Sequence, residues 1–317
     1  VIFSICLSLV CLSGLAQEES RAQDESATPG VPGANTLSNV NPSVVGIDSA
    51  LLYLNIDRIM RQALDSAAFP GAVVLLAKEG KIFFEKAYGY HTFDNQRAVK
   101  TTDIYDLASV TKTTGATLAL MKLYELGLFD IDRTMGEYWP KIAKRGKQDL
   151  VMRDVLAHQA GLKAWIPYWS ESQRKNGKYR WNTVKYDSSR RFPYKISAAG
   201  LWMHKDFKEK KIYRMIKRTK VNDKRVYLYS GLTFYLIPEL IQNETGLSFD
   251  KYLEKTFYEP LGANSLGFKA GENFPLARIV PTEVDSFFRM QLLHGVVHDE
   301  GAAMMQGVSG NAGLFSN

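Results

Sequence analysis

Apolar positions recur with helical periodicity at the beginning of the folded part of the chain. From Ala50 to Leu64, large apolar residues are spaced at steps of three and four, which is typical of one buried helix face. A proline–glycine pair then ends the helix. Two apolar runs follow at 72–77 and 82–88, separated by Lys-Glu-Gly-Lys, and this spacing predicts a β-hairpin.

Helical periodicity dominates the rest of the chain. A long helix is predicted to begin at Ser109 and to end at Gly127. Shorter helices are predicted at 152–157, 232–240 and 249–257. Residues 170–225 are polar, basic and aromatic, and we expect them to form an insertion. A helix and hairpin followed by a mainly helical stretch indicate an α+β protein with a separate helical lobe.

The order of these elements also predicts the domain organisation. We expect one domain over 49–317, with an α/β lobe portion at 49–106 and a mainly helical lobe at 107–317. Residues 17–48 are rich in Gln, Glu, Ser, Pro, Gly and Asn, and we expect them to form a flexible leader.

The first residues differ in composition from the rest of the chain. Residues 1–10 are almost wholly apolar, and Gly14 and Ala16 place small residues just before a polar run. This pattern predicts a signal peptide at 1–16, without its start and cleaved after Ala16. A membrane anchor is the weaker interpretation, because about 16 apolar residues fall short of the roughly 20 that span a bilayer.

The positions of the cysteines narrow the chemistry. Cys6 and Cys11 are the two cysteines of the chain, and both lie in the predicted signal peptide. A mature chain without cysteine has no disulfide, no thiol nucleophile and no thiolate metal ligand. We therefore expect an exported protein, in a bacterial periplasm.

The net charge of +7 is concentrated in one segment. Residues 204–225 contain ten Lys or Arg and three Asp or Glu, so this segment alone carries +7. Two interpretations stay open: docking to an anionic envelope surface, or a solvated helical insertion that the charges keep soluble. Nucleic-acid binding is not expected of an exported chain without a recognisable nucleic-acid-reading motif.

A Ser-x-x-Lys pattern occurs three times, so the pattern alone is a weak signal. The three occurrences are Ser109 to Lys112, Ser172 to Lys175, and Ser248 to Lys251. Ser172 lies in a polar stretch, and Ser248 precedes a helix as its expected N-cap. Only Ser109 follows apolar residues and opens a helix with an apolar face.

The context of Ser109 provides what nucleophilic catalysis needs. Residues three apart on a helix are neighbours, so Lys112 can reach the Ser109 hydroxyl. The amino end of a helix stabilises a developing oxyanion, and a buried lysine can lose its proton and act as a base. We predict that Ser109 is the nucleophile and Lys112 its base. The alternative is a buried serine at a helix start with a lysine that reaches solvent.

Several motifs in order resemble one family. Asp106-Leu-Ala-Ser-Val-Thr-Lys112, with the upstream Pro-Gly-Ala and hairpin, resembles the first motif of class C β-lactamases and of the related penicillin-binding carboxypeptidases and esterases. Further similar segments follow in the same order at 153–162, 229–231, 257–262, 279–283 and 307–316. The resemblance extends from about residue 49 to the last residue.

The resemblance implies two further site residues. Tyr229 corresponds to the tyrosine of the family's Tyr-x-Asn motif, which implies that it relays protons to the leaving group and activates water in deacylation. Gly231 occupies the asparagine position, so no side-chain amide is available there to hold Lys112 or a substrate amide. This departure puts β-lactam and peptide binding in doubt, whereas a small ester would suffer less.

The family's third motif, Lys- or His-Thr-Gly, is not found. We expect that the chain stops before this motif, before the last strands and before the second oxyanion donor. Residues 17–317 alone are therefore expected to be inactive and prone to aggregate.

The resemblance implies a secreted serine hydrolase that forms an acyl-enzyme. Its substrate would be a D-alanyl peptide, a β-lactam or an ester, that is, a small molecule or a peptide. No cofactor or metal is expected, and the oligomeric state stays open. The alternative is a non-catalytic binder or sensor at the cell envelope that keeps the penicillin-recognition fold.

The histidines offer competing sites. His294 and His298 are four apart and could place metal ligands on one helix face, but a zinc protease would need glutamate where this chain has glycine. His158 could belong to a Ser-His-Asp arrangement with Asp154 or Asp299. The simpler interpretation of His158 is a buried histidine that the backbone satisfies.

Overall fold

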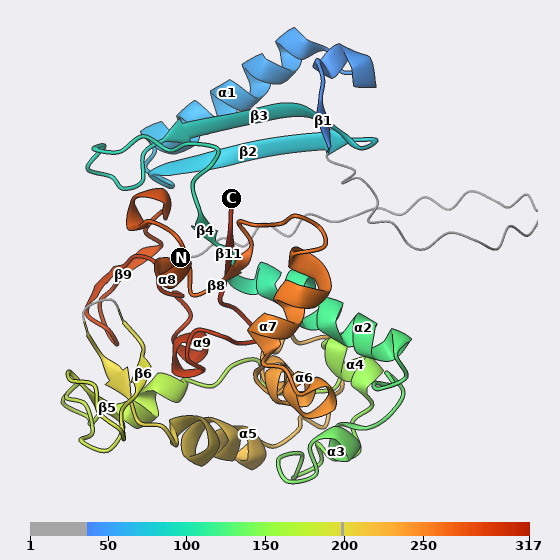
Figure 1. Cartoon of the computed structure of the whole chain (residues 1–317), viewed down its shortest axis with the longest axis vertical. Helices are drawn as coiled ribbons and strands as arrows, with labels where there is room; N and C mark the ends of the chain where they lie inside the picture. The colour runs from blue at the N-terminus through green and yellow to red at the C-terminus, as the bar shows by residue number, and fades with distance from the viewer. Residues whose placement is uncertain (1–36, 198–199) are drawn as a thin grey trace, which may run out of the picture. The chain divides into compact units, whose positions relative to one another are not determined.

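The computed structural model describes residues 37–197 and 200–317, so the predicted signal peptide at 1–16 and its cysteines lie outside the described residues. Helices and short strands mix along the chain (Figure 1), and the predicted α+β class is confirmed. Among the described helices, none has the length and apolar character needed to cross a membrane.

The first helix packs on a small sheet. Helix α1 (Ser49–Asp65) begins after Asp48, whose carboxylate accepts a hydrogen bond from the Leu51 amide at 2.9 Å. Strands β2 (Gly71–Lys78) and β3 (Lys81–Gly89) pair antiparallel along their whole length. The predicted helix and hairpin are therefore confirmed.

The sheet has a third strand that the sequence pattern does not predict. Strand β1 (Ser38–Asn39) pairs in parallel with β3, and a 3₁₀ turn at Pro42–Val45 follows it. Val45 is buried in a core that also contains Met60 of α1. The last part of the segment predicted as a leader therefore contains regular structure, and its buried residues Pro42 and Val45 anchor it.

The helix predicted from Ser109 has an irregular start. A 3₁₀ turn at Ala108–Val110 leads into a π-type turn at Lys112–Thr117, and only then does the regular helix α2 (Leu118–Glu125) begin. Two threonine hydroxyls of the π-type turn donate to a carbonyl of the 3₁₀ turn, and they compete there with backbone amides. Such single π-type turns within helices are frequent at functional sites.

Helices around α2 enclose the largest apolar core. The predicted shorter helices correspond to α4 (Met152–Leu156), α6 (Ile237–Thr245) and α7 (Phe249–Leu253). Additional helices are α3 (Met135–Tyr138), α8 (Ala270–Asn273) and α9 (Glu300–Met304). Further turns are 3₁₀ at Tyr168–Ser172, Thr233–Tyr235 and Leu276–Arg278, and π-type at Glu254–Tyr258. The additional helices have only four or five residues, too few for a periodic pattern.

The segment predicted as an insertion contributes to this core. Its strands form an antiparallel sheet in the order β5 (Val184–Lys185), β7 (Trp202–Met203), β6 (Tyr194–Lys195). A π-type turn at Lys208–Tyr213 and helix α5 (Arg214–Arg218) follow. Met203, Ile212 and Ile216 are fully buried. Apolar residues spaced among the basic ones therefore pack this segment against the helical core.

A second three-stranded sheet joins segments that are distant in the sequence. Strand β11 (Leu314–Ser316) lies between β4 (Tyr105–Asp106) and β8 (Gly267–Phe268), and pairs antiparallel with both. Strands β9 (Glu283–Asp285) and β10 (Gln291–Leu293) form a separate antiparallel pair. Because β4 leads into Ser109, its pairing with β11 brings residues around 311 beside the predicted nucleophile.

Candidate active site

The predicted nucleophile and base are in contact. Lys112 Nζ lies 2.9 Å from Ser109 Oγ and donates a second hydrogen bond, also of 2.9 Å, to the carbonyl oxygen of Asn311. Ser109 is exposed, whereas only 7% of Lys112 is exposed. The amine is therefore held beneath an accessible hydroxyl, which is the arrangement that proton transfer from serine needs.

A tight turn presents Ser109. The preceding residue, Ala108, has a φ of 48°, which is uncommon for a residue with a side chain. The Ala108 amide donates to Asp106 Oδ1 at 2.8 Å, and this bond stabilises the turn. Strained backbone of this kind persists only where surrounding contacts fix it.

Two aromatic rings lie beside the Lys112 amine. The ring centroid of Tyr229 is 5.1 Å from Lys112 Nζ, and that of Phe234 is 5.6 Å away. Within the described part of the chain, no hydrogen bond joins the Tyr229 hydroxyl to Ser109 or Lys112. The structure thus brings Tyr229 beside the base, with 44% of the residue exposed.

The His158 ring packs at a tilt against the ring of this tyrosine. The ring centroids of His158 and Tyr229 are 4.6 Å apart, and His158 Nδ1 accepts a hydrogen bond from the Ser230 amide at 3.2 Å. Burial and the positive charge of Lys112 lower the pKa of His158, which favours a neutral ring. The geometry therefore agrees with the interpretation that backbone groups satisfy the hydrogen bonding of His158. It does not agree with a Ser-His-Asp arrangement, because among the described contacts the His158 ring reaches neither Asp154 nor Asp299.

Gly231 leaves unoccupied space near the base. A Cβ placed at this position would lie 3.9 Å from Tyr235 Cε2 and 4.0 Å from Asn311 Cβ, so a Cβ fits there without a clash. The Asn311 amide does not substitute for the missing one. Its Nδ2 donates to the Tyr235 hydroxyl and to Asp299 Oδ1, each at 3.1 Å, and its Oδ1 accepts from Ser309 at 2.6 Å.

The other two Ser-x-x-Lys segments do not form such a pair. Ser172 is buried and donates to the Trp169 carbonyl, whereas Lys175 is exposed. Ser248 occupies the N-cap position of α7 without a side-chain capping bond, and Lys251 forms an ion pair with Glu254. All three segments have the same Ser-x-x-Lys spacing, so the environment of each serine decides whether it lies beside its lysine.

The region that contains His294 and His298 is not a helix. Both residues lie in turns between β10 and α9, so the alternative of two metal ligands on one helix face is wrong. His294 Nε2 contacts the carbonyls of Leu276 and Ile279, and His298 Nδ1 contacts Asp106. Across residues 37–197 and 200–317, no group of three His, Cys, Asp or Glu residues is arranged to hold a metal ion.

Three contributors to the site are not predicted from the sequence. Asn311 participates through its backbone carbonyl, which has no sequence signature. Asp106 belongs to the segment that resembles the family's first motif, but the motif assigns it no role. His298 contacts Asp106 across more than half of the chain. The only available signal for Asp106 is its position three residues before the nucleophile.

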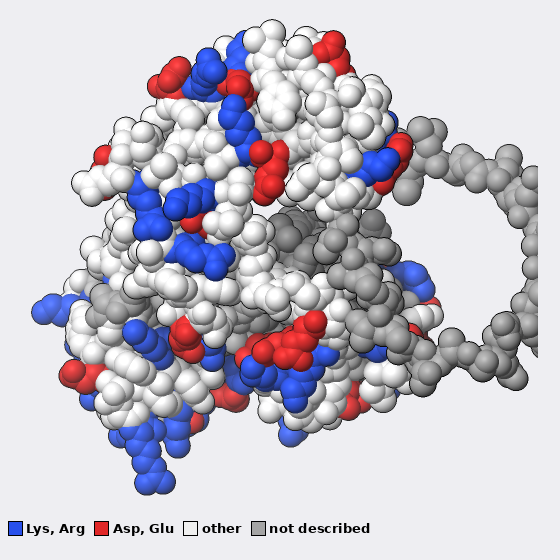
Figure 2. Space-filling view, turned by 45° about the horizontal axis from the view of Figure 1, so that its top comes forward, with Lys and Arg blue, Asp and Glu red and all other residues white. Residues whose placement is uncertain are grey.

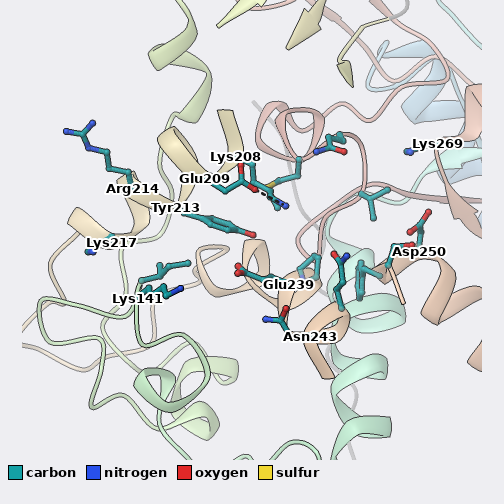
Figure 3. A pocket seen from close by; sticks show the side chains of 18 residues that line it. Lys141, Lys208, Glu209, Tyr213, Arg214, Lys217, Glu239, Asn243, Asp250 and Lys269 are labelled. Atoms are coloured by element: carbon teal, nitrogen blue, oxygen red, sulfur yellow. Dashed lines mark ion pairs between the residues drawn. The ribbon is translucent and has the colours of Figure 1, made fainter. Parts of the chain in front are cut away.

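A separate surface pocket of about 900 Å³ is lined mainly by residues of the helical lobe. Its lining includes Lys141, Lys208, Glu209, Tyr213, Arg214, Lys217 and Glu239 (Figure 3). Neither Ser109 nor Lys112 nor Tyr229 lines it. The pocket is therefore distinct from the Ser–Lys site, and its lining mixes positive and negative charges.

An exposed serine paired with a buried lysine on an α+β fold defines the class of Ser-x-x-Lys serine hydrolases. The Beta-lactamase family model matches residues 56–283, and the chain belongs to this family. The predicted relationship to serine β-lactamases and penicillin-binding proteins is thereby confirmed.

Curated relatives bear the names of peptide- and cell-wall-cleaving enzymes. A putative D-alanyl-D-alanine carboxypeptidase of Salmonella paratyphi A is 29% identical over 308 residues, which cover 89% of this chain and 65% of the relative. An N-acetylmuramyl-L-alanine amidase of Bacillus subtilis is 29% identical over 317 residues, which cover 90% of this chain and 65% of the relative. The chain thus spans slightly less than two thirds of these relatives. Together with the family, their names support a serine hydrolase in general.

Solved structures agree on the fold. A class C beta lactamase has a TM-score of 0.59 at 17% identity, covering 86% of this chain and 63% of that one. EstCE1, a hydrolase with promiscuous acyltransferase activity, has a TM-score of 0.57 at 18% identity, covering 84% and 69%. The octameric penicillin-binding protein homologue of Pyrococcus abyssi has a TM-score of 0.58 at 19% identity, covering 83% and 53%.

Proposed function

We propose that the protein is a serine hydrolase that acts through an acyl-enzyme on Ser109. The observation that carries this proposal is the 2.9 Å contact between Lys112 Nζ and Ser109 Oγ. As Oγ attacks a substrate carbonyl, its proton passes to Lys112, and the Ser109 amide donates to the oxyanion that forms. Collapse of this tetrahedral intermediate breaks the bond to the leaving group and leaves Ser109 acylated.

Tyr229 is proposed to carry protons in the second half of the reaction. Its place beside Lys112 supports a relay in which the phenol protonates the leaving group and then takes a proton from the attacking water. Hydrolysis of the acyl group restores Ser109. Loss of the Tyr229 hydroxyl in Tyr229→Phe would therefore slow deacylation at least as much as acylation, and unchanged turnover would remove Tyr229 from the mechanism.

The proposed substrate is a carbonyl compound of the D-alanyl peptide, β-lactam or ester type, and Gly231 favours an ester. Position 231 offers no side-chain amide, and the side-chain amide of Asn311 is occupied by Tyr235, Asp299 and Ser309. A peptide or β-lactam amide would lose a hydrogen-bond partner here that an ester does not need. The names of the carboxypeptidase and amidase relatives support the peptide alternative, and EstCE1 supports a broader acyl specificity.

The assignment of the nucleophile is tested by covalent labelling. In the full-length protein, we expect a fluorophosphonate or penicillin probe to label Ser109, and Ser109→Ala to abolish labelling. Ser248→Ala is the matched control, because Ser248 also begins a Ser-x-x-Lys segment and is exposed. Labelling that persists in Ser109→Ala, or that depends on Ser248, would contradict the proposal.

A non-catalytic binder is the second candidate function. The missing amide at 231 and the absence, within the described residues, of a hydrogen bond from the Tyr229 hydroxyl to Ser109 or Lys112 both favour it. A binder would hold penicillin reversibly, without covalent mass on Ser109. Intact-protein mass spectrometry after penicillin treatment therefore distinguishes the two functions.

We also propose that the protein is exported to the periplasm and that segment 204–225 contacts an anionic envelope surface. The apolar pattern of residues 1–16 supports export. For the second proposal, Arg214, Lys217 and Arg218 of α5 are exposed and form no ion pair with described residues, whereas Lys210 pairs with Asp206.

A further inference from the structure

The side chain of Asp106, three residues before Ser109, has no exposed surface, and its carboxylate has three hydrogen-bond donors. Asp106 Oδ1 accepts from the Ala108 amide at 2.8 Å. Asp106 Oδ2 accepts from the backbone amide of His298 at 2.8 Å and from its Nδ1 at 3.0 Å. A buried carboxylate needs such partners, because an unpaired one is costly. Asp106 therefore ties the turn before Ser109 to the segment around His298.

The bond from Ala108 acts on the strained residue of the site. Ala108 has a positive φ, and its amide lies one residue before the nucleophile. Without an acceptor for this amide, the turn would have less reason to keep its uncommon conformation. Asp106 thus holds the turn from which Ser109 extends.

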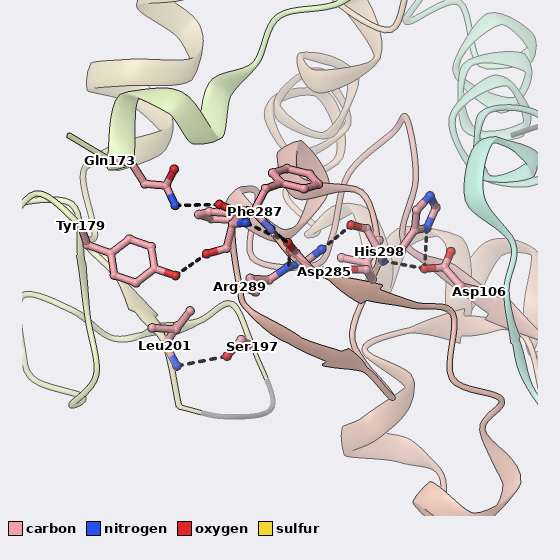
Figure 4. A network of polar contacts seen from close by, with 11 residues as sticks. Asp106, Gln173, Tyr179, Ser197, Leu201, Asp285, Phe287, Arg289 and His298 are labelled. Atoms are coloured by element: carbon pink, nitrogen blue, oxygen red, sulfur yellow. Dashed lines mark hydrogen bonds and ion pairs between the residues drawn. The ribbon is translucent and has the colours of Figure 1, made fainter. Parts of the chain in front are cut away.

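A buried ion pair holds His298 from the other side (Figure 4). Arg289 and Asp285 have no exposed side-chain surface, and Arg289 Nε donates to Asp285 Oδ2 at 2.9 Å. Arg289 Nη1 donates to the Val297 carbonyl at 2.6 Å, and Nη2 donates to the His298 carbonyl. The guanidinium therefore fixes the backbone that carries the imidazole, with donors in a rigid planar arrangement.

We infer that His298, acting through Asp106, is a positioning residue for Ser109, and that the Arg289–Asp285 pair holds His298 in place. The inference rests on the proposed function in treating Ser109 as the nucleophile. His298 is not itself catalytic, because its ring contacts Asp106 and not Ser109 or Lys112 among the described contacts. Its ring gives Asp106 Oδ2 a second donor beside the His298 backbone amide, and Asp106 Oδ1 holds the turn.

Two amide variants of His298 distinguish the need for a donor at the place of Nδ1 from the need for any polar side chain. In His298→Asn, the side-chain NH₂ occupies nearly the place of Nδ1 and can still donate to Asp106. In His298→Gln, the NH₂ lies nearer the place of Nε2, which is farther from Asp106. We expect His298→Gln to slow fluorophosphonate labelling of Ser109 roughly tenfold or more, because small misplacements of a reacting group are costly. The labelling rate of His298→Asn should stay within about threefold of that of the natural protein.

The expected loss lies in the acylation step. For ester turnover, Gln should lower kcat while KM changes little, because His298 does not contact the substrate site. His294→Asn is the matched control, since His294 contacts only the carbonyls of Leu276 and Ile279 among described residues. Equal rates for the Asn and Gln variants, or a loss in the His294 control as large as in Gln, would overturn the inference.

The positioning role of His298 can also be tested by a crystal structure, without an activity measurement. In a crystal structure of His298→Gln, we expect the Ser109 Oγ to Lys112 Nζ contact to be lost and Ala108 to leave its positive φ. If the natural protein labels at no serine, the proposed function fails, yet this comparison still decides the positioning role. An unchanged Ser109–Lys112 contact in the Gln variant would refute it.

Discussion

At the scale of residues, the proposed base is held by two acceptors of different kinds. Lys112 donates to the hydroxyl of Ser109, the proposed nucleophile, and to the backbone carbonyl of Asn311. A second, fixed acceptor limits the rotamers of a long side chain and keeps its amine near the nucleophile. The Asn311 side chain is occupied in a separate network, so only its backbone serves the site.

The empty space at Gly231 leads to a prediction on specificity. Because a Cβ fits there, Gly231→Asn should fold and should place an amide beside the site. We expect the rate of penicillin acylation relative to p-nitrophenyl ester turnover to rise roughly tenfold, the worth of one well-placed hydrogen bond. Gly231→Ala is the control, since it adds the Cβ without the amide. An equal change in both variants would show that the amide is not the missing element.

At the scale of elements, the site depends on how the helix after Ser109 begins. The 3₁₀ turn and the π-type turn replace the regular first turns that the apolar pattern predicts. Lys112 nevertheless reaches Ser109, because a spacing of three keeps side chains adjacent in both geometries. The predicted neighbourhood is thus correct even though the predicted regular helix is not.

The link between β4 and the turn before α9 should make stability depend on pH. Burial opposes the charged form of His298, but the hydrogen bond and negative charge of Asp106, with smaller effects of Asp299 and Glu283, together raise its pKa above the ordinary 6.5. Protonated His298 therefore stabilises the fold. This contribution is complete below pH 6.5 and is lost as the pH rises through the raised value in the folded state.

Denaturation experiments can detect this contribution. The free energy of unfolding of the natural protein, relative to His298→Asn, should be larger at about pH 6 than at about pH 9. Urea unfolding followed by tryptophan fluorescence measures the difference at each pH. If the difference in free energy of unfolding between the natural protein and His298→Asn is the same at both pH values, the ion pair of His298 with Asp106 does not contribute to stability.

At the scale of the whole molecule, charge is distributed unevenly. Figure 2 shows Lys and Arg side chains in several groups on the face in view, some of them beside acidic side chains. Segment 204–225 carries a net charge equal to that of the entire chain, and part of it is exposed without ion-pair partners among described residues. Long-range attraction to an anionic surface would therefore be concentrated at α5.

The surface proposal predicts binding that depends on salt. Vesicles that contain anionic phospholipid should bind the protein at low ionic strength and release it as salt screens the charges, whose reach is roughly 10 Å at 0.1 M. Arg214→Glu combined with Lys217→Glu should weaken binding more than Arg97→Glu combined with Lys100→Glu, which makes the same charge change elsewhere. Equal weakening by both pairs would indicate an effect of net charge alone.

Local patterns account for the elements that the sequence predicts. The periodicity of 49–65 and the paired runs of β2 and β3 extend over many residues, so the helix and hairpin follow from local information. Strands β4, β8 and β11 have two or three residues each, and their pairing spans the chain. Such short strands show no period and exist only because their partners are brought together.

The sequence by itself determined the identity of the candidate nucleophile and base. Ser109 and Lys112 lie three apart in a helical context, and ordered motifs indicate the family. Only the tertiary structure decided what surrounds them: the Asn311 carbonyl on Lys112, His298 on Asp106, and Arg289 behind His298. The physical reason is that adjacency along a helix is fixed by local geometry, whereas hydrogen bonds between distant segments depend on how the whole core packs.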